Sequence, residues 1–378
     1  GIGMASRGSI PKIMEAAGIE MLPPESAIPV IRRELVSGST RGEVVIAKKV
    51  GVLLQEWDDT GGLDAAAIPA GKFPSAEGPM VGKIAKTGLF TPLTIETTID
   101  PKVQPYLFDH KIDDIPVLPG VMGLEAFAEA ALALLPGWHI DAIEDVEFFA
   151  PFKFYHNKPR TVTVEAVIHP VDGGLAANCK LVGRRTLPNQ TEPQVTTHFT
   201  ARVRLIKELR VPSSSAKPKT PAKNTISSDD IYRLYFHGPT YQVVEKAWRD
   251  GGRVVGLMAK GLPNNHYPAE QPTVAAPRLI ELCFQTAGVW EMGAQGLMGL
   301  PKHIDKLSFL GARELTTERL YAVVAPNAHK GFDAEVVDAQ GNCYLRMIGY
   351  DTAPFITIVD SDRLKPLKAA SALGPVAA

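Results

Sequence analysis

The chain has few cysteines, almost no net charge and no long hydrophobic run. Its 378 residues include three cysteines, far apart and without CxxC spacing, so we expect neither a disulfide framework nor a zinc site. A formal net charge of −1 offers no basic face to nucleic acid. No apolar stretch reaches the roughly 18–20 residues that a membrane-spanning helix needs. We therefore expect a cytoplasmic protein that binds neither nucleic acid nor a membrane.

Several catalytic motifs are missing as well. The nine histidines form no HExxH or other metal-ligand spacing, which predicts no metal site. No GxSxG elbow of a serine hydrolase occurs. Gly1-x-Gly3 is not followed by a complete glycine-rich fingerprint, and there is no YxxxK, which argues against a nicotinamide site. The chemistry has to come from individual side chains.

Two polar segments rich in proline or glycine, 56–80 and 211–225, divide the chain and are expected to be linkers. The second has a low-complexity composition with no means of packing. Residues 1–55 carry two short helical patterns and a strand (Ile10–Ala17, Glu25–Ser37 and Glu43–Ala47), too little to close a core alone. We expect them to complete a domain that lies upstream, in a fragment of a longer chain. The tail, 364–378, is expected to be frayed.

The regions 81–210 and 226–363 share one order of elements. Each contains a long apolar helix opened by proline, Gly120 to about Leu135 and Pro277 to about Ala294, and then alternating strands. The predicted strands are Arg160–His169, Ala177–Gly183, Thr196–Leu205, His303–Phe309, Arg319–Val324, Phe332–Asp338 and Tyr344–Asp351. A helix with so little polar surface has to be covered, most simply by a curved sheet. The sequence therefore predicts a tandem duplication, an α+β fold of two helix-in-sheet halves.

The stretch from His110 to Gly120 places an imidazole shortly before the first apolar helix. Pro119 suits a helix start, and the unbonded N–H groups at Gly120 form a positive end that can hold a carbonyl oxygen. A base beside such a helix start predicts proton abstraction next to a carbonyl. A lone histidine before a turn is more often a surface or capping residue, and spacing alone leaves this alternative open.

On the second helix, Glu281 and Gln285 are four residues apart and share one face. Their neighbours are apolar, so we expect desolvation to raise the pKa of the Glu281 carboxyl and favour its protonated form. Gln285 can donate an amide hydrogen bond that fixes this carboxyl. The alternative is an exposed acid in the first helical turn, where it stabilises the helix dipole. His237 lies in a Gly-Pro turn, where a structural role is the commoner one.

These residues resemble a known family. His110-x-x-x-Asp114-x-x-x-x-Pro119 resembles the HxxxGxxxxP motif of dehydratase domains from modular polyketide synthases and polyunsaturated fatty acid synthases. Ile280–Gln285 resembles the Dxxx(Q/H) motif in the second half of those domains. Phe236–Gln242 is similar to their YGPxFQ segment, with His237 in the place of the tyrosine.

The order and separation of the three motifs resemble those of the family, which implies its double-hotdog fold, two tandem hotdog folds. The resemblance covers roughly residues 81–363, with the N-terminal hotdog in 81–210 and the C-terminal one in 226–363. Residues 1–55 resemble the C-terminal end of a ketoreductase domain, which precedes the dehydratase in such synthases.

The resemblance implies syn elimination of water from a (3R)-3-hydroxyacyl chain carried on the phosphopantetheine of an acyl carrier protein. In that interpretation neutral His110 removes the C2 proton, protonated Glu281 gives a proton to the departing hydroxyl, and Gln285 orients Glu281. The substrate-binding residues would be Pro119, Gly120, His237, Gly238 and Pro239. The resemblance further implies no cofactor bound by this domain, the carrier protein and neighbouring synthase domains as partners, and a homodimer.

Two positions depart from the family pattern. Asp114 replaces a glycine, which could alter the loop after His110 or place a second carboxyl near the site. Glu281 is one methylene longer than the usual aspartate, and a displacement of about 1 Å at a reacting centre can cost on the order of 10²-fold in rate. The alternatives are a non-catalytic or product-shaping hotdog domain, a dehydratase that also isomerises the double bond, and a pure interaction module for carrier or neighbouring domains.

Overall fold

The computed structural model describes residues 6–20, 22–37, 46, 49–51, 78–87, 92–186, 192–211, 213–215, 217–219, 225–311, 319–329, 331–356, 362 and 364–371. The chain divides into two compact units, Gly1–Leu63 with Gly88–Phe90, and Asp64–Thr87 with Thr91–Ala378. Within the described ranges, no helix has the length and apolar character needed to cross a membrane.

Among its described residues, the first unit contains two helices and a minimal sheet. Helix α1 (Ile10–Ala16) and helix α2 (Pro24–Ser37) lie where the sequence predicts them. Strand β1 (Ile19–Glu20) pairs antiparallel with strand β2 (Lys49–Val50). The strand predicted at 43–47 lies outside the described residues except for Ile46, which belongs to no strand. No side chain of α1 is buried, in keeping with a segment too small to close its own core.

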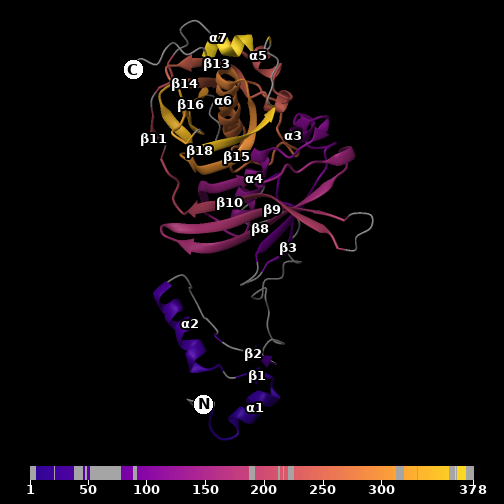
Figure 1. Ribbon diagram of the computed structural model, residues 1–378, viewed down its shortest axis with the longest axis vertical. Helices are drawn as coiled ribbons and strands as arrows, with labels where there is room; N and C mark the ends of the chain where they lie inside the picture. The colour runs from indigo at the N-terminus through magenta and orange to yellow at the C-terminus, as the bar shows by residue number, and fades with distance from the viewer. Residues whose placement is uncertain are drawn as a thin grey trace. The chain divides into compact units, whose positions relative to one another are not determined.

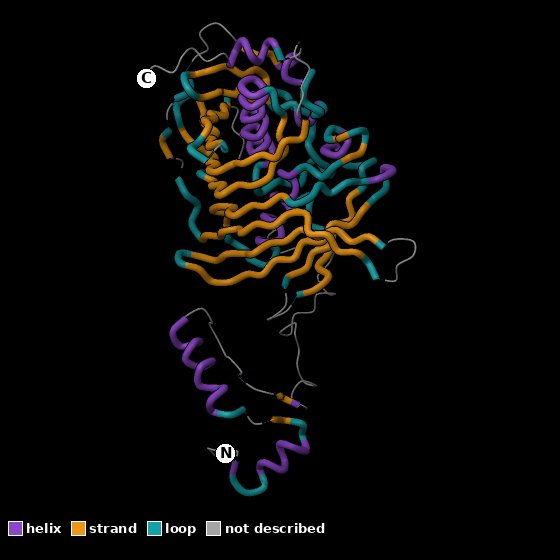
Figure 2. Tube along the Cα trace, viewed as in Figure 1, coloured by secondary structure: helices purple, strands orange, loops and turns teal. Residues whose placement is uncertain are grey.

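The second unit is built on one long antiparallel sheet, whose strands lie side by side in Figure 2. The strand order is β12-β13-β14-β16-β17-β18-β15-β7-β10-β9-β8-β4-β3. In the first half the strands are β3 (Lys83–Lys86), β4 (Leu93–Ile99), β7 (His139–Phe148), β8 (Arg160–Val171), β9 (Gly174–Arg185) and β10 (Gln194–Ile206). In the second half they are β12 (Thr225–Ser227), β13 (Val244–Asp250), β14 (Arg253–Met258), β15 (Met298–Phe309), β16 (Leu320–Pro326), β17 (Phe332–Asp338) and β18 (Asn342–Ile356).

Each half of this sheet packs around one apolar helix. Helix α4 (Gly120–Leu132) contacts strands β7 to β10, and helix α6 (Pro277–Gln295) contacts strands of the second half. In Figure 1 α6 runs inside the curve of the second-half strands. Every side chain of α4 from Val121 to Leu132 is buried, which explains why the sequence there has almost no polar face. The predicted helix-in-sheet halves are confirmed.

The halves are joined by backbone pairing between β7 and β15, which places Leu307 opposite Ile143. At one end of this β7–β15 pairing, the Nδ1 atom of His303 lies 2.8 Å from Oε1 of Glu147. The α4 and α6 helices also touch each other. The duplicated halves therefore share one continuous sheet and one core, which fixes their relative position.

Short elements complete the second unit. They are α3 (Pro105–Phe108), the β5–β6 hairpin (Lys111–Ile112 and Ile115–Pro116), the 3₁₀ turns η4 (Tyr155–Asn157) and η5 (Pro239–Tyr241), strand β11 (Ser213–Ser214), α5 (Ser228–Tyr232) and α7 (Lys365–Ser371).

Segments expected to be loose turn out to be packed. The prediction that segment 211–225 has no means of packing is wrong for its described residues: β11 pairs with β18, and Lys219 O accepts a 3.0 Å hydrogen bond from the Trp248 indole. The expected frayed tail is also wrong over 364–371, because Leu364 and Leu367 are buried and α7 packs on α6. Backbone hydrogen bonds and two leucines suffice to fix segments of polar composition.

Candidate active site

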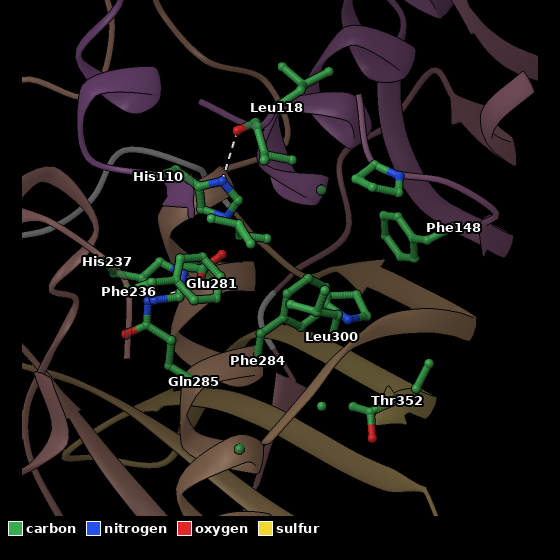
Figure 3. Close-up of a pocket in the computed structure, with 18 of the residues that line it drawn as sticks. His110, Leu118, Phe148, Phe236, His237, Glu281, Phe284, Gln285, Leu300 and Thr352 are labelled. Carbon is green, nitrogen blue, oxygen red and sulfur yellow. Dashed lines mark hydrogen bonds and ion pairs between the residues drawn. The ribbon is translucent and has the colours of Figure 1, made fainter. Parts of the chain in front are cut away.

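A cavity of about 240 Å³ in the second unit collects residues from both halves. His110, Gly120 and Phe148 line it from the first half, and His237, Glu281 and Gln285 from the second. Figure 3 shows His110 above the group formed by His237, Glu281 and Gln285. The structure thus brings all three predicted catalytic side chains to one space.

His110 is oriented by its own hairpin. Its Nδ1 atom lies 2.8 Å from the Val117 carbonyl oxygen, and the Val117 N–H returns a 3.0 Å bond to the His110 carbonyl. A carbonyl can only accept, so Nδ1 carries the proton in the neutral ring and Nε2 keeps its lone pair. The backbone therefore selects the tautomer whose Nε2 can act as a base.

The turn that returns the chain to Val117 explains the aspartate at 114. Asp113 and Asp114 have φ values of 52° and 61°, the left-handed conformation of a two-residue hairpin turn. Aspartate tolerates this conformation better than most residues do, so it can stand where glycine is usual. Asp114 is exposed and is not one of the cavity-lining residues, so it adds no second carboxyl to the site.

The electrostatics keep His110 neutral. Burial of the ring, followed by the charge of His237, lowers the pKa of His110 from 6.5 to about 4. The ring of Phe236 meets the imidazole edge-on at 5.1 Å, and the His237 ring centroid lies 5.4 Å away. A neutral imidazole near pH 7 is the form that can accept a proton.

Glu281 is buried, with 6% of its surface exposed, so the alternative of an exposed first-turn acid is wrong. Its Oε1 accepts a 2.8 Å hydrogen bond from the Gln285 amide, and Nε2 of His237 lies 3.2 Å from the same oxygen. Both donors meet Oε1, which leaves Oε2 as the oxygen that can exchange a proton with a substrate.

The orientation of Gln285 is itself fixed by Tyr232. The Val244 N–H donates to the Tyr232 oxygen at 2.8 Å, and the Tyr232 hydroxyl donates to Oε1 of Gln285 at 2.7 Å. The amide nitrogen must then face Glu281 and the Tyr241 carbonyl, which it meets at 2.8 Å. Sequence reasoning missed Tyr232, and its only signal is that a tyrosine packed against a core needs a partner for its hydroxyl.

The expected rise in the pKa of Glu281 is wrong. Burial does raise it, but the hydrogen bonds from His237 and Gln285 and the electrostatic interactions with the His237 and His110 rings together lower it further, so that the pKa lies below its ordinary value. Apolar neighbours along the helix predicted only the burial. The lowering donor, His237, comes from a different segment.

The predicted substrate-binding residues divide into two groups. Gly120 and His237 line the cavity, whereas Pro119, Gly238 and Pro239 are not among its lining residues, and Pro239 is exposed. A Cβ at Gly120 would lie 2.9 Å from the Phe148 ring, so glycine lets that ring rest against the start of α4. Pro119 is the N-cap residue of the helix, where its fixed φ of −59° fits.

The described side chains contain no group of three or more metal-ligating residues. The arrangement consists of a neutral imidazole with a free Nε2, a hydrogen-bonded carboxyl and the N–H groups at a helix start, in a largely apolar cavity that Glu291 and Thr352 also line. These groups can take a proton from carbon, stabilise the resulting oxyanion and deliver a proton to a leaving oxygen.

Comparisons with known proteins agree with this geometry. Residues 79–177 match the family described as polyketide synthase dehydratase domain, and residues 210–358 match the polyketide synthase dehydratase N-terminal domain. One polyunsaturated fatty acid synthase subunit from Thraustochytrium sp. is 22% identical over 222 residues, which cover 57% of this chain and 8% of the relative. Polyketide synthase ThaG of Burkholderia thailandensis is 23% identical over 259 residues, which cover 65% of this chain and 4% of the relative.

The aligned residues therefore span less than a tenth of the length of each of these curated relatives. Among solved structures, the dehydratase domain from the CurF module of curacin polyketide synthase superposes with a TM-score of 0.61 at 17% identity. That superposition covers 73% of this chain and 99% of the domain. The predicted double-hotdog fold is confirmed.

Proposed function

The chain belongs to the polyketide synthase dehydratase family, and from this we propose that it removes water from a (3R)-3-hydroxyacyl chain on the phosphopantetheine of an acyl carrier protein, leaving an enoyl thioester. The observation that carries the proposal is the meeting of His110 and Glu281 in one largely apolar cavity, with Nε2 of the imidazole left free.

The reaction balances on these residues. The thioester carbonyl oxygen accepts hydrogen bonds from N–H groups at the Gly120 end of α4, which makes the C2 proton more acidic. Nε2 of His110 takes that proton, the C–H electrons form the C2–C3 double bond, and the 3-hydroxyl leaves with a proton from Glu281 as water. Protonated His110 then loses its proton and Glu281 regains one, which restores the site. Each positioned acid or base is typically worth about 10²–10⁴ in rate.

Glu281 has to be protonated in the substrate complex. Hydrogen bonding lowers its pKa in the free protein. An acyl chain that fills the cavity expels water and strengthens the burial that opposes ionisation. Gln285 and His237 keep Oε1 occupied, so the proton goes to Oε2. In this scheme Gln285 orients the acid and does not itself exchange a proton.

The surroundings of the domain are part of the proposal. It binds no cofactor of its own and works in the cytoplasm with the carrier protein and the neighbouring domains of one synthase. Residues 1–55 are the end of a ketoreductase-like domain, and the dehydratase is a homodimer.

The test uses His110→Phe and Glu281→Gln with a carrier-bound 3-hydroxyacyl thioester, followed by mass spectrometry for loss of one water. Each variant is expected to lower the rate at least about 10²-fold, because each lacks one proton-transferring group. The matched controls are His329→Phe and Glu270→Gln, which change exposed residues outside the cavity. No water loss by the wild type would support the non-catalytic alternative, and an enoyl product with a shifted double bond by NMR would support the isomerising one.

A further inference from the structure

We infer that Asp109 is a positioning residue, whose backbone and carboxylate tie the His110 segment of the first half to the 238–241 turn of the second and so set how His110 faces Glu281. This inference rests on the proposed function and deepens it.

Asp109 accepts two hydrogen bonds from the other half. Its carbonyl oxygen accepts the Gly238 N–H at 2.7 Å, and its Oδ2 accepts the Thr240 N–H at 2.8 Å. The next residue, His110, pairs with His237 in an isolated antiparallel bridge. The segment that carries the base is therefore bonded directly to the turn that follows His237.

The same turn is bonded to the helix that carries the acid. The Arg278 guanidinium donates to the Thr240 carbonyl at 3.2 Å, and the Gln285 amide donates to the Tyr241 carbonyl at 2.8 Å. His237 in turn meets Glu281 at 3.2 Å. The 238–241 turn thus links Asp109 to α6, and a shift of this turn moves the carboxyl of Glu281 relative to His110.

The close approach of the two segments also explains the glycine at 238. Its φ of −85° is open to any residue, so conformational freedom is not the reason. A Cβ at Gly238 would lie 2.3 Å from Oδ1 of Asp109 and 2.8 Å from its Cβ, so a side chain has no room. Gly238 serves the contact between the halves, which accounts for its absence from the cavity wall.

Removing the carboxylate leaves a specific defect. Thr240 is 4% exposed, so its N–H would lose its acceptor in a place that water hardly reaches. Asparagine at 109 keeps an oxygen that can accept this N–H, whereas alanine does not. A positioning role therefore predicts that the two substitutions differ.

The experiment compares Asp109→Ala, Asp109→Asn and the control Asp100→Ala. Asp100 accepts the Lys102 N–H at 2.9 Å in an exposed turn, and it does not line the cavity. With a 3-hydroxyacyl thioester we expect Asp109→Ala to lower kcat on the order of 10²-fold with little change in KM, since it displaces reacting groups by about 1 Å. Asp109→Asn should recover most of that loss.

A second readout does not depend on turnover. In an NMR titration of the His110 ring, Asp109→Ala should move the midpoint up toward that of an ordinary histidine, because the ring loses burial and its place beside His237. If Asp109→Ala does not fold, Gly238→Ala, which presses a methyl onto Asp109, should show the same two changes.

Equal kcat values and equal His110 titrations for Asp109→Ala and Asp100→Ala would overturn the inference. The failure of the proposed function looks different: the wild type then removes no water, while the His110 titration still reports whether Asp109 positions the ring.

Discussion

The low pKa of His110 makes the stability of the domain depend on pH in a calculable way. The folded protein holds the ring at a pKa of about 4, whereas the unfolded chain has the ordinary value of 6.5. Below pH 6.5 the His110 imidazole binds a proton in the unfolded chain but stays neutral in the folded protein, so the free energy of unfolding falls as the pH falls. The loss ends near pH 4 and amounts to at most about 3.4 kcal/mol, an upper bound because the side chain is partly exposed.

The variant His110→Phe isolates this effect. Phenylalanine keeps a ring in the same place but cannot titrate, and the lost hydrogen bond to Val117 is a constant offset at every pH. Between pH 7 and pH 5.5 the wild type should lose about 1.2 kcal/mol more than the variant. This window lies above the pKa of Glu281, which is already below its ordinary 4.5. Urea unfolding at the two pH values measures the difference.

Parallel losses in the two proteins would refute the reasoning, because they would show that the imidazole is not held away from water. The same pKa governs catalysis. If His110 is the base, the kcat/KM profile should contain a limb near pH 4, well below the range of an ordinary histidine, where protonation of the imidazole removes the base.

Two further predictions concern side chains that do not line the cavity. Tyr232→Phe removes the hydroxyl that orients Gln285 and should lower kcat about tenfold, the effect of one lost hydrogen bond. The control is Tyr155→Phe, which changes an exposed tyrosine. Equal kcat values for the two variants would contradict the prediction. Glu125→Gln should destabilise the fold by about 1–3 kcal/mol in urea unfolding, because this buried carboxyl group accepts hydrogen bonds from two backbone N–H groups just ahead of α6. The control is Glu208→Gln, which changes an exposed residue. Equal unfolding midpoints for the two variants would contradict the prediction.

The two long helices, α4 and α6, and the strands β8 to β10 and β15 to β18 could be predicted from the sequence because their signals are local. The apolar stretch beginning at Gly120 indicates a buried helix, and the alternating residues of β8, β9 and β10 indicate strands. Strand β7 was not predicted, because as a strand inside the sheet it has consecutive buried residues rather than a clean alternation, and its pairing with β10 contains register shifts. Its second partner, β15, begins more than a hundred residues later, and no local pattern announces such a pairing.

For the site, spacing singled out side chains that the structure brings together in one cavity, but it gave the wrong charge for one of them. The four-residue interval from Glu281 to Gln285 is a property of one helix, and the structure keeps their hydrogen bond at 2.8 Å. The His237 imidazole reaches Glu281 through folding alone. Burial can be estimated from neighbours in sequence, whereas a compensating donor cannot. The sequence therefore overestimated how strongly the carboxyl resists ionisation.

The two shifted pKa values together constrain the reaction. In the free protein at neutral pH, His110 is neutral and Glu281 is ionised, since both pKa values lie below their ordinary ranges. Elimination with a neutral base and a protonated acid needs one proton more than this resting site holds. The missing proton is the one on Glu281. The pH dependence of kcat is therefore set by the pKa of Glu281 in the substrate complex, while that of kcat/KM is set by the pKa values of His110 and Glu281 in the free protein. The hydrogen bonds that hold Glu281 in place thus oppose its protonation, and burial by the acyl chain has to supply the difference.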